Sequence, residues 1–392
     1  MATIPSGILR VAVTALPAIA ALEPLWLGLE ALADASFFQS WLWIGTWLEC
    51  LPPNVIAHLL RVECADTVVA LGILVPGSAT RHKIFRSRGL FLNRTGDPYL
   101  DEISIEYNGL LCERGQESTL TKAAVEHLLL DYPEWDELYL DGLHRPDIVE
   151  SLALDGAQLR RRRQRNFHYV DVAGLRSQNR DYLGTLGPKT RHNIRRSIRE
   201  YEKSGSLRLH EAESVVQARE YLLRLRQLHQ RYWEKKGMPG SFSNAFFAAF
   251  HDRLIERKFG DGVIQLLQIT AGEKEVGYIY NFVHRGRVYN YQSGLSYDVN
   301  TNQNRPGLVC HAYAVQHNLA KGLEIYDFMA GDVEYKEALS EKSLPMTWDV
   351  IQRDLWKFRL EETLRTLLRR LRARGGDPPA RSQAKGRKGR RT

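Results

Sequence analysis

Hydrophobic positions recur with two periods along the chain, three to four residues in some segments and two in others. The longer period predicts helices and the shorter one predicts strands. Three apolar runs separated by short glycine-containing turns, at 263–269, 276–283 and 287–295, indicate an antiparallel meander. The helices that we expect are 20–33, 36–49, 119–130, 190–204, 214–236, 244–257 and 308–320. The further strands that we expect are 11–15, 67–75, 88–94, 137–141, 166–172, 207–209, 324–329 and 346–352.

The order of these elements is nearly the same in the two halves of the chain. The second half reads strand, two helices, three-strand meander, helix, strand, short helix and strand, and the first half can be written almost identically. We therefore predict the α/β (α+β) class, with two halves at 1–175 and 176–355, each a mixed, mostly antiparallel sheet flanked by helices. A helical extension and a basic, disordered tail at 356–392 follow.

Charge is concentrated at the end of the chain. Residues 365–392 hold 11 Lys and Arg against a single acidic residue, Asp377, whereas the other 364 residues hold 43 Lys and Arg against 45 Asp and Glu. The folded body is therefore nearly neutral, and we expect no specific DNA binding. The tail is a candidate for weak contact with an anionic membrane surface.

Cysteine usage and hydropathy indicate the compartment. The four cysteines form no CxxC pair, which is typical of a protein in a reducing cytosol. No apolar stretch of about 18 residues appears, so we expect no spanning helix and a cytoplasmic protein, with peripheral contact at the inner membrane face as a further expectation. No His, Cys or acidic spacing typical of a metal site occurs, so we predict no metal.

The junction between a loop and a helix at Asn304-Arg305-Pro306-Gly307 is a candidate phosphate site. Free amides and a partial positive charge at a helix N-terminus suit an anion, and Arg305 adds a fork of donors. Gly307 lets a ligand approach the backbone closely. The plainer interpretation is that Pro-Gly only starts a helix. The position between two strands that flank the helix favours the ligand site.

A second candidate segment runs from Tyr326 to Lys336 and reads YDFMAGDVEYK. A tyrosine hydroxyl such as that of Tyr335 can protonate a leaving group. A carboxylate, Asp327 or Asp332, can orient or deprotonate an acceptor, and Lys336 can bind an anion or stabilise an oxyanion. The alternative is that Asp332 caps the short helix, Tyr335 packs at the edge of the core and Lys336 is solvated.

A third candidate is the basic face of the helix that begins at Thr190. Arg191, Arg195 and Arg199 recur every four residues and therefore share one face. This face either recognises an anionic acceptor or phosphate, or is simply solvated.

The sequences TRHNIRRSIRE, from Thr190, and RPGLVCHAYAVQHNLAKGLEIYDFMAGDVEYK, from Arg305, together with Phe37-Phe38-Gln39-Ser40-Trp41, resemble the GNAT acetyltransferases of the CelD/BcsL type. That family is associated with cellulose and exopolysaccharide biosynthesis and is related to the FemAB aminoacyl transferases. The resemblance covers the chain up to its tail and is strongest over 180–350.

The resemblance implies tandem GNAT-like domains and direct acyl transfer from acetyl-CoA, or another acyl-CoA, to a saccharide or amine acceptor, together with polysaccharide biosynthesis machinery as a partner. It places the donor at Asn304, Arg305, Gly307 and Leu308, and the general acid at Tyr335. The loop keeps one glycine where the family pattern has two small residues, which favours a FemAB-like variant. Two alternatives stay open: aminoacyl transfer from charged tRNA, motivated by the basic segment 159–199, and a non-catalytic GNAT scaffold of a polysaccharide synthase complex.

Overall fold

The structure is a computed structural model that describes residues 8–81, 85–103, 105–297 and 304–374. Its first half contains β1 (Leu9–Ala15), α1 (Ile19–Leu32), α2 (Trp41–Cys50), β2 (His58–Cys64), β3 (Thr67–Arg81), β4 (Phe85–Leu92), β5 (Leu111–Cys112), α3 (Glu117–Leu130), β6 (Glu137–Leu143), α4 (Pro146–Glu150) and β7 (Ala157–Asp171). The predicted tail beyond 374 lies outside the described residues.

The second half begins directly after β7. It contains α5 (Val172–Ser177), α6 (Tyr182–Thr185), α7 (Pro188–Glu202), β8 (Leu207–Glu211), α8 (Val215–Lys235), α9 (Ala245–Lys258), β9 (Ile264–Ala271), β10 (Lys274–His284), β11 (Arg287–Leu295), α10 (Pro306–Ala320), β12 (Ile325–Ala330), α11 (Glu334–Leu339), β13 (Lys342–Arg353) and α12 (Trp356–Arg374). Polar caps fix where two of the helices begin. Ser214 accepts a hydrogen bond from the first turn of α8, and Asn244 does the same for α9.

One sheet of thirteen strands runs through the described part of the chain in the order β1-β2-β3-β4-β6-β13-β7-β12-β11-β10-β9-β8, with β5 beside β3. Neighbouring strands are antiparallel except in two places. The pairs β4–β6 and β11–β12 are parallel and stay in register for three residues each. The predicted class, a mixed and mostly antiparallel sheet flanked by helices, is confirmed.

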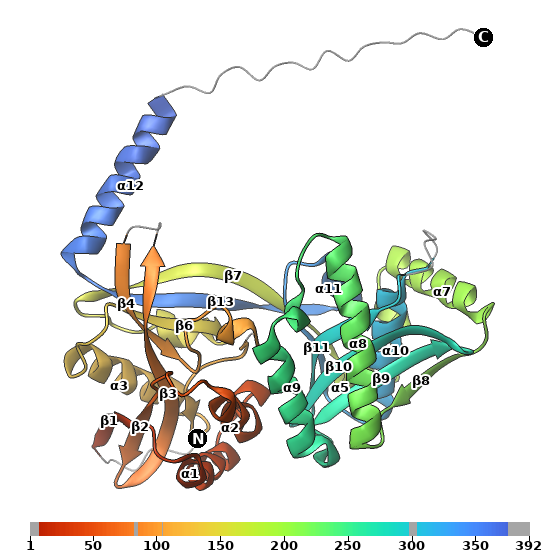
Figure 1. Cartoon of the computed structure of the whole chain (residues 1–392), viewed down its shortest axis with the longest axis horizontal. Helices are drawn as coiled ribbons and strands as arrows, with labels where there is room; N and C mark the ends of the chain where they lie inside the picture. Colours follow the sequence, from red (N-terminus) through yellow and green to blue (C-terminus); the bar gives the residue numbers. More distant parts are fainter. Residues whose placement is uncertain (1–7, 82–84, 104, 298–303, 375–392) are drawn as a thin grey trace.

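The two halves exchange strands in the middle of this sheet. β13, from the end of the second half, lies between β6 and β7, and β7 lies between β13 and β12. Figure 1 shows both strands running across the junction. The sheet of each half is therefore completed by a strand of the other, whereas the expected boundary at 175/176 follows chain order.

Helices cover the sheet and also join the halves. α3 packs on the first half and α7 with α10 on the second, each over its own buried cluster. The third cluster belongs to both halves, because α2 packs against α9. There the ring of Phe37 stacks on Phe282 at 4.2 Å, and Trp43 meets Phe250 edge to face at 4.8 Å. The junction is thus built like a domain core.

Candidate active site

Asp327 lies in the junction on β12 and is fully buried. Its carboxylate accepts hydrogen bonds from the Tyr107 hydroxyl at 2.6 Å, the Arg287 guanidinium at 2.7 Å and the Met329 N–H at 2.7 Å. Burial raises the pKa of Asp327, and the charge of Arg287 offsets part of that rise. A carboxylate that accepts from three donors fixes the positions of those donors. Because one of them, Tyr107, belongs to the first half, Asp327 links the two halves.

Two residues bound to this carboxylate have a strained backbone. Tyr107 has φ +54° and Met329 has φ +61°, in the left-handed region that non-glycine residues rarely adopt. The register between β12 and β7 also shifts between Asp327 and Ala330. Each such conformation costs on the order of 1–3 kcal/mol and persists only where surrounding contacts fix it. The network around Asp327 supplies those contacts.

Ala330, just after the strained residue, is held from two sides. Its N–H donates to the Glu106 carboxylate at 2.8 Å, and its carbonyl accepts from the Lys336 ammonium at 2.8 Å. Burial raises the pKa of Glu106 to about 7, against a smaller lowering by Lys336. Burial lowers the pKa of Lys336, and the charge of Glu106 opposes that effect. A carboxyl group that titrates near neutral pH is suited to act as a general base.

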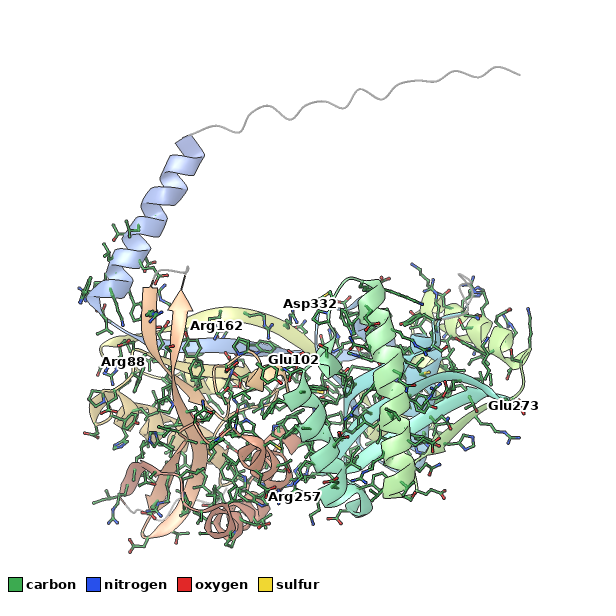
Figure 2. The ribbon with its side chains drawn as sticks, viewed as in Figure 1. Arg88, Glu102, Arg162, Arg257, Glu273 and Asp332 are labelled. Carbon is green, nitrogen blue, oxygen red and sulfur yellow. The ribbon has the colours of Figure 1, made fainter. Side chains whose placement is uncertain are left out.

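Glu106 also faces a cavity of about 430 Å³, lined by residues of the first half and by Trp348 of β13. Its lining is Trp47, Arg94, Asp101, Ile103, Ile105, Glu106, Asp141, Arg162, Arg163 and Trp348. Figure 2 labels one of these lining residues, Arg162, over the strands of the first half. Arg94 is paired with both Asp101 and Asp141, so its charge is already compensated.

Arg163 differs from the other arginines of this cavity. Its guanidinium lies over the Trp348 ring at 3.7 Å and has no hydrogen-bond or ion-pair partner among the residues that the structure describes. The side chain is exposed to the cavity, and an aromatic ring holds it flat. Arg163 can therefore bind an anionic group of a ligand in the same space as Glu106.

Tyr335 lies on the other side of Lys336, on α11. Its ring stacks on His311 of α10 at 5.1 Å and meets Phe328 edge to face. Burial raises the pKa of the Tyr335 hydroxyl, so this group stays protonated at neutral pH. Within the described residues the hydroxyl has no hydrogen-bond partner, which leaves it able to donate to a ligand.

The predicted phosphate site is the beginning of α10, which starts at Pro306, two residues earlier than expected. Arg305 is its exposed N-cap residue and caps no amide with its side chain. Asn304 has a buried Oδ1 without a partner in the described part of the chain. Gly307 and Leu308 therefore lie in the first turn, where amides are free. The stack of His311 on Tyr335 brings this turn near the candidate acid.

The remaining predicted residues lie elsewhere. Asp332 is exposed and pairs with Arg165 at 3.3 Å, and α11 is capped by Val333, so the interpretation of Asp332 as a helix cap is wrong. Arg191 donates to the Gly184 carbonyl at 3.0 Å. The other two arginines of that face are exposed on α7, which packs on α10.

Three comparisons bear on this site. Residues 188–337 match the family described as an acetyltransferase (GNAT) domain. No curated protein sequence matches the chain. The crystal structure of FemX is similar with a TM-score of 0.54 and 8% identity, over 90% of this chain and 99% of that one.

Two further structures are similar over most of their length. The structure of L-PGS from Bacillus licheniformis has a TM-score of 0.49 and 13% identity, over 88% of this chain and 95% of that one. A tandem GNAT protein from the clavulanic acid biosynthesis pathway has a TM-score of 0.45 and 12% identity, over 88% and 99%. The predicted GNAT fold and transferase class are confirmed, with the matched domain in the second half. The assignment to the CelD/BcsL type stays a prediction.

Proposed function

We propose that this GNAT-fold transferase moves an acyl group from an acyl-CoA, with acetyl-CoA as the first candidate, to an amine or hydroxyl of a cell-envelope or exopolysaccharide-related acceptor. The observation that carries the proposal is the arrangement around Ala330. Glu106 accepts from the backbone N–H of Ala330 and Lys336 donates to its backbone carbonyl, beside a polar cavity and next in sequence to a protonated tyrosine.

In the proposed step the acceptor loses its proton to the Glu106 carboxylate while its lone pair attacks the thioester carbonyl. Lys336 stabilises the negative charge that develops on the carbonyl oxygen. The carbon–sulfur bond then breaks, and the leaving thiolate takes the proton of the Tyr335 hydroxyl. Solvent afterwards restores the proton to tyrosine and removes it from Glu106. Asp327 acts as a positioning residue, because its carboxylate is already occupied by three donors.

The donor's phosphates bind, in this proposal, at the start of α10. The free amides around Gly307 and Leu308 and the exposed guanidinium of Arg305 suit them, with Asn304 beside them. The acceptor occupies the cavity, where Arg163 recognises an anionic group and the paired charges suit hydroxyl-rich chemistry. Asp332 lies at the edge of this region. Arg191, Arg195 and Arg199 are proposed to bind more distant anionic groups of either substrate.

Aminoacyl transfer from charged tRNA is the alternative function. The exposed Arg195 and Arg199 on α7 favour it. The rest of the basic segment gives it less support, because the arginines of β7 other than Arg163 are engaged with carboxylates of the protein itself. These pairs are Arg160–Glu362, Arg161–Asp349, Arg162–Asp141 and Arg165–Asp332. The third option is a non-catalytic scaffold. It does not account for Glu106, whose pKa burial raises to about 7.

Contact with an anionic membrane surface is proposed through α12, which rises from the body in Figure 1. Trp356, Leu360 and Leu364 follow at intervals of four residues and are 75%, 44% and 41% exposed. The helix carries seven Lys and Arg against two Glu, so its charge complements an anionic surface. No described helix is both long and apolar enough to span a membrane.

Calorimetry and a thiol-release assay test the proposal. The protein is titrated with acetyl-CoA, and thiol release is followed with a panel of amino sugars and oligosaccharides. We expect Lys336→Met and Tyr335→Phe each to lower kcat by about 10²-fold or more while acetyl-CoA affinity changes little. Lys258→Met and Tyr313→Phe are the matched controls. The proposal fails if acetyl-CoA does not bind and both variants keep the wild-type rate. Salt-sensitive binding of aminoacyl-tRNA in the same assay supports the alternative.

A further inference from the structure

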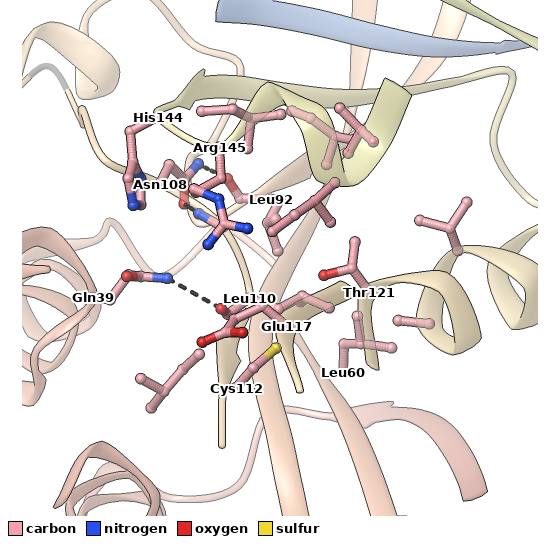
Figure 3. Close-up of a pocket in the computed structure, with 18 of the residues that line it drawn as sticks. Gln39, Leu60, Leu92, Asn108, Leu110, Cys112, Glu117, Thr121, His144 and Arg145 are labelled. Atoms are coloured by element: carbon pink, nitrogen blue, oxygen red, sulfur yellow. Dashed lines mark hydrogen bonds between the residues drawn. The ribbon is translucent and has the colours of Figure 1, made fainter. Parts of the chain in front are cut away.

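The first half contains a second cavity, of about 240 Å³, far along the chain from the matched domain. It lies where β4 and β6 separate after their three parallel register pairs, and α3 and α4 close it. Figure 3 shows this space, with Thr121 of α3 on one side and Arg145 above it. This cavity and the one that Glu106 faces have no lining residue in common.

The cavity has an apolar floor and a polar rim. The floor is formed by buried side chains of the first-half core, among them Leu60, Leu74, Leu92, Val125, Leu128 and Leu138. The polar lining residues are Asp34, Gln39, Asn108, Glu117, Thr121, His144 and Arg145, so two carboxylates line the same space as the Arg145 guanidinium. The polar groups thus gather at one end. A long apolar ligand with one polar end matches this division.

His144 adds a polar atom for that end of the ligand. Its Nδ1 is buried and has no hydrogen-bond partner among the described residues. Burial lowers the pKa of His144 to about 4, so the ring is neutral at physiological pH. Buried polar atoms are almost always paired, and an unpaired one beside a cavity indicates a missing partner.

In the second half, the corresponding place is next to the donor site proposed above. There α10 stands where α3 stands in the first half, between the meander and the parallel strand. Its Val309 and Cys310 are fully buried, and His311, Phe328 and Tyr335 pack their rings together beside β12. Because protein cores pack without large voids, a leucine-lined cavity of this size indicates a site for a ligand.

We propose that this cavity binds the straight aliphatic chain of a fatty acyl compound, with its carboxylate or thioester end at His144 and Arg145. The leucine floor excludes sugars and nucleotides, whose hydroxyl and ring polar atoms find no partner there. The Arg145 guanidinium, which already shares Asp147, lies at the rim and supplies the positive charge. The proposal does not rest on the proposed transferase function, although the His144 ring packs at 5.4 Å on Tyr107, which donates to Asp327.

Binding of saturated fatty acids of six to fourteen carbons, and of the matching acyl-CoA series, tests the site. We expect affinity to rise about threefold to fourfold per methylene and then to level off when the cavity is full. Ala124→Phe fills the cavity from α3 and is expected to abolish the dependence on chain length, and Ala124→Leu to shorten the preferred chain. Ala249→Phe, at an exposed position of α9, is the matched control. Thermal unfolding confirms that each variant is folded.

The two series distinguish the source of the chain. Binding of free acids that Arg145→Gln weakens identifies a carboxylate ligand, and binding of the acyl-CoA series alone identifies a thioester. An affinity that does not depend on chain length overturns the proposal. So does unchanged chain-length dependence in a folded Ala124→Phe or Ala124→Leu variant. Loss of activity in Lys336→Met leaves this result untouched, so the two proposals fail separately.

Discussion

Replacing Glu106 with glutamine is predicted to make the protein less active and, above neutral pH, more stable. Glutamine keeps the size of the side chain and an oxygen that accepts from the Ala330 N–H. It removes the ionisable group whose pKa burial raises from 4.5 to about 7. The substitution is therefore expected to lower activity and to raise stability above neutral pH. Loss of a purely structural contact would lower both.

The stability effect follows from linkage. One pKa unit corresponds to about 1.4 kcal/mol, so ionising Glu106 costs about 3 kcal/mol more in the folded protein than in the unfolded chain. A carboxyl whose pKa is raised on folding contributes stability that is complete below pH 4.5 and is lost as pH rises through about 7. Between pH 5 and pH 8 the free energy of unfolding of the wild type should fall by up to about 3 kcal/mol because of Glu106. That contribution should be absent in Glu106→Gln.

Urea unfolding at pH 5 and pH 8 measures this difference, and a pH–rate profile measures the function. If Glu106 is the base, kcat/KM of the wild type rises with pH and levels off above about 7. The kcat/KM of the variant should be about 10²-fold to 10⁴-fold lower, and its pH profile should lack the inflection near pH 7. Glu102→Gln, on the neighbouring 3-10 helix at Leu100–Ile103, is the control. A variant whose stability falls with pH as the wild type's does, or whose rate keeps the inflection, refutes the reasoning.

Two further predictions concern the junction and α12. Tyr107→Phe leaves the buried Asp327 carboxylate one donor short, so the free energy of unfolding should fall by about 1–3 kcal/mol in urea titrations. Tyr313→Phe, whose hydroxyl has no hydrogen-bond partner among the described residues, should change it by less than about 0.5 kcal/mol. Trp356→Ser combined with Leu360→Ser should weaken co-sedimentation with anionic vesicles several-fold without changing activity, since both side chains are exposed on α12. Equal binding of the wild type to neutral and anionic vesicles would contradict the role assigned to charge.

Local patterns predicted much of the fold. The expected meander corresponds to β9, β10 and β11, and the expected helix at 214–236 corresponds to α8, because these segments have strong periodicity and clear turns or caps. The strand β2 was missed although Leu60, Val62 and Cys64 alternate in it. The strand β7 was found only from 166 onward. Its first part reads as a basic loop, and its arginines are compensated by carboxylates from distant segments.

The sequence predicts the second-half residues of the candidate site and not those of the first half. Tyr335 and Lys336 belong to a recognisable run, whereas Glu106 and Tyr107 lie in a segment without a motif. Glu106 meets Ala330, 224 positions away, and Tyr107 meets Asp327, 220 positions away. No local pattern encodes such a contact, because it depends on how the halves are joined. Strong backbone distortion at Tyr107 and Met329 is likewise fixed by tertiary contacts and has no signal in residue type.

The exchange of strands explains why these contacts form where they do. β7 and β13 each complete the sheet of the other half. They lie side by side between β6 and β12, so only two strands separate β6 of the first half from β12 of the second. The segment before β5 then lies against the end of β12, where Tyr107 donates to Asp327 and Glu106 accepts from Ala330. Burial at this junction raises the pKa of Glu106 and lowers that of Lys336. Neither half alone contains both groups or the burial that tunes them, so the chemistry proposed for this chain is a property of the joined pair.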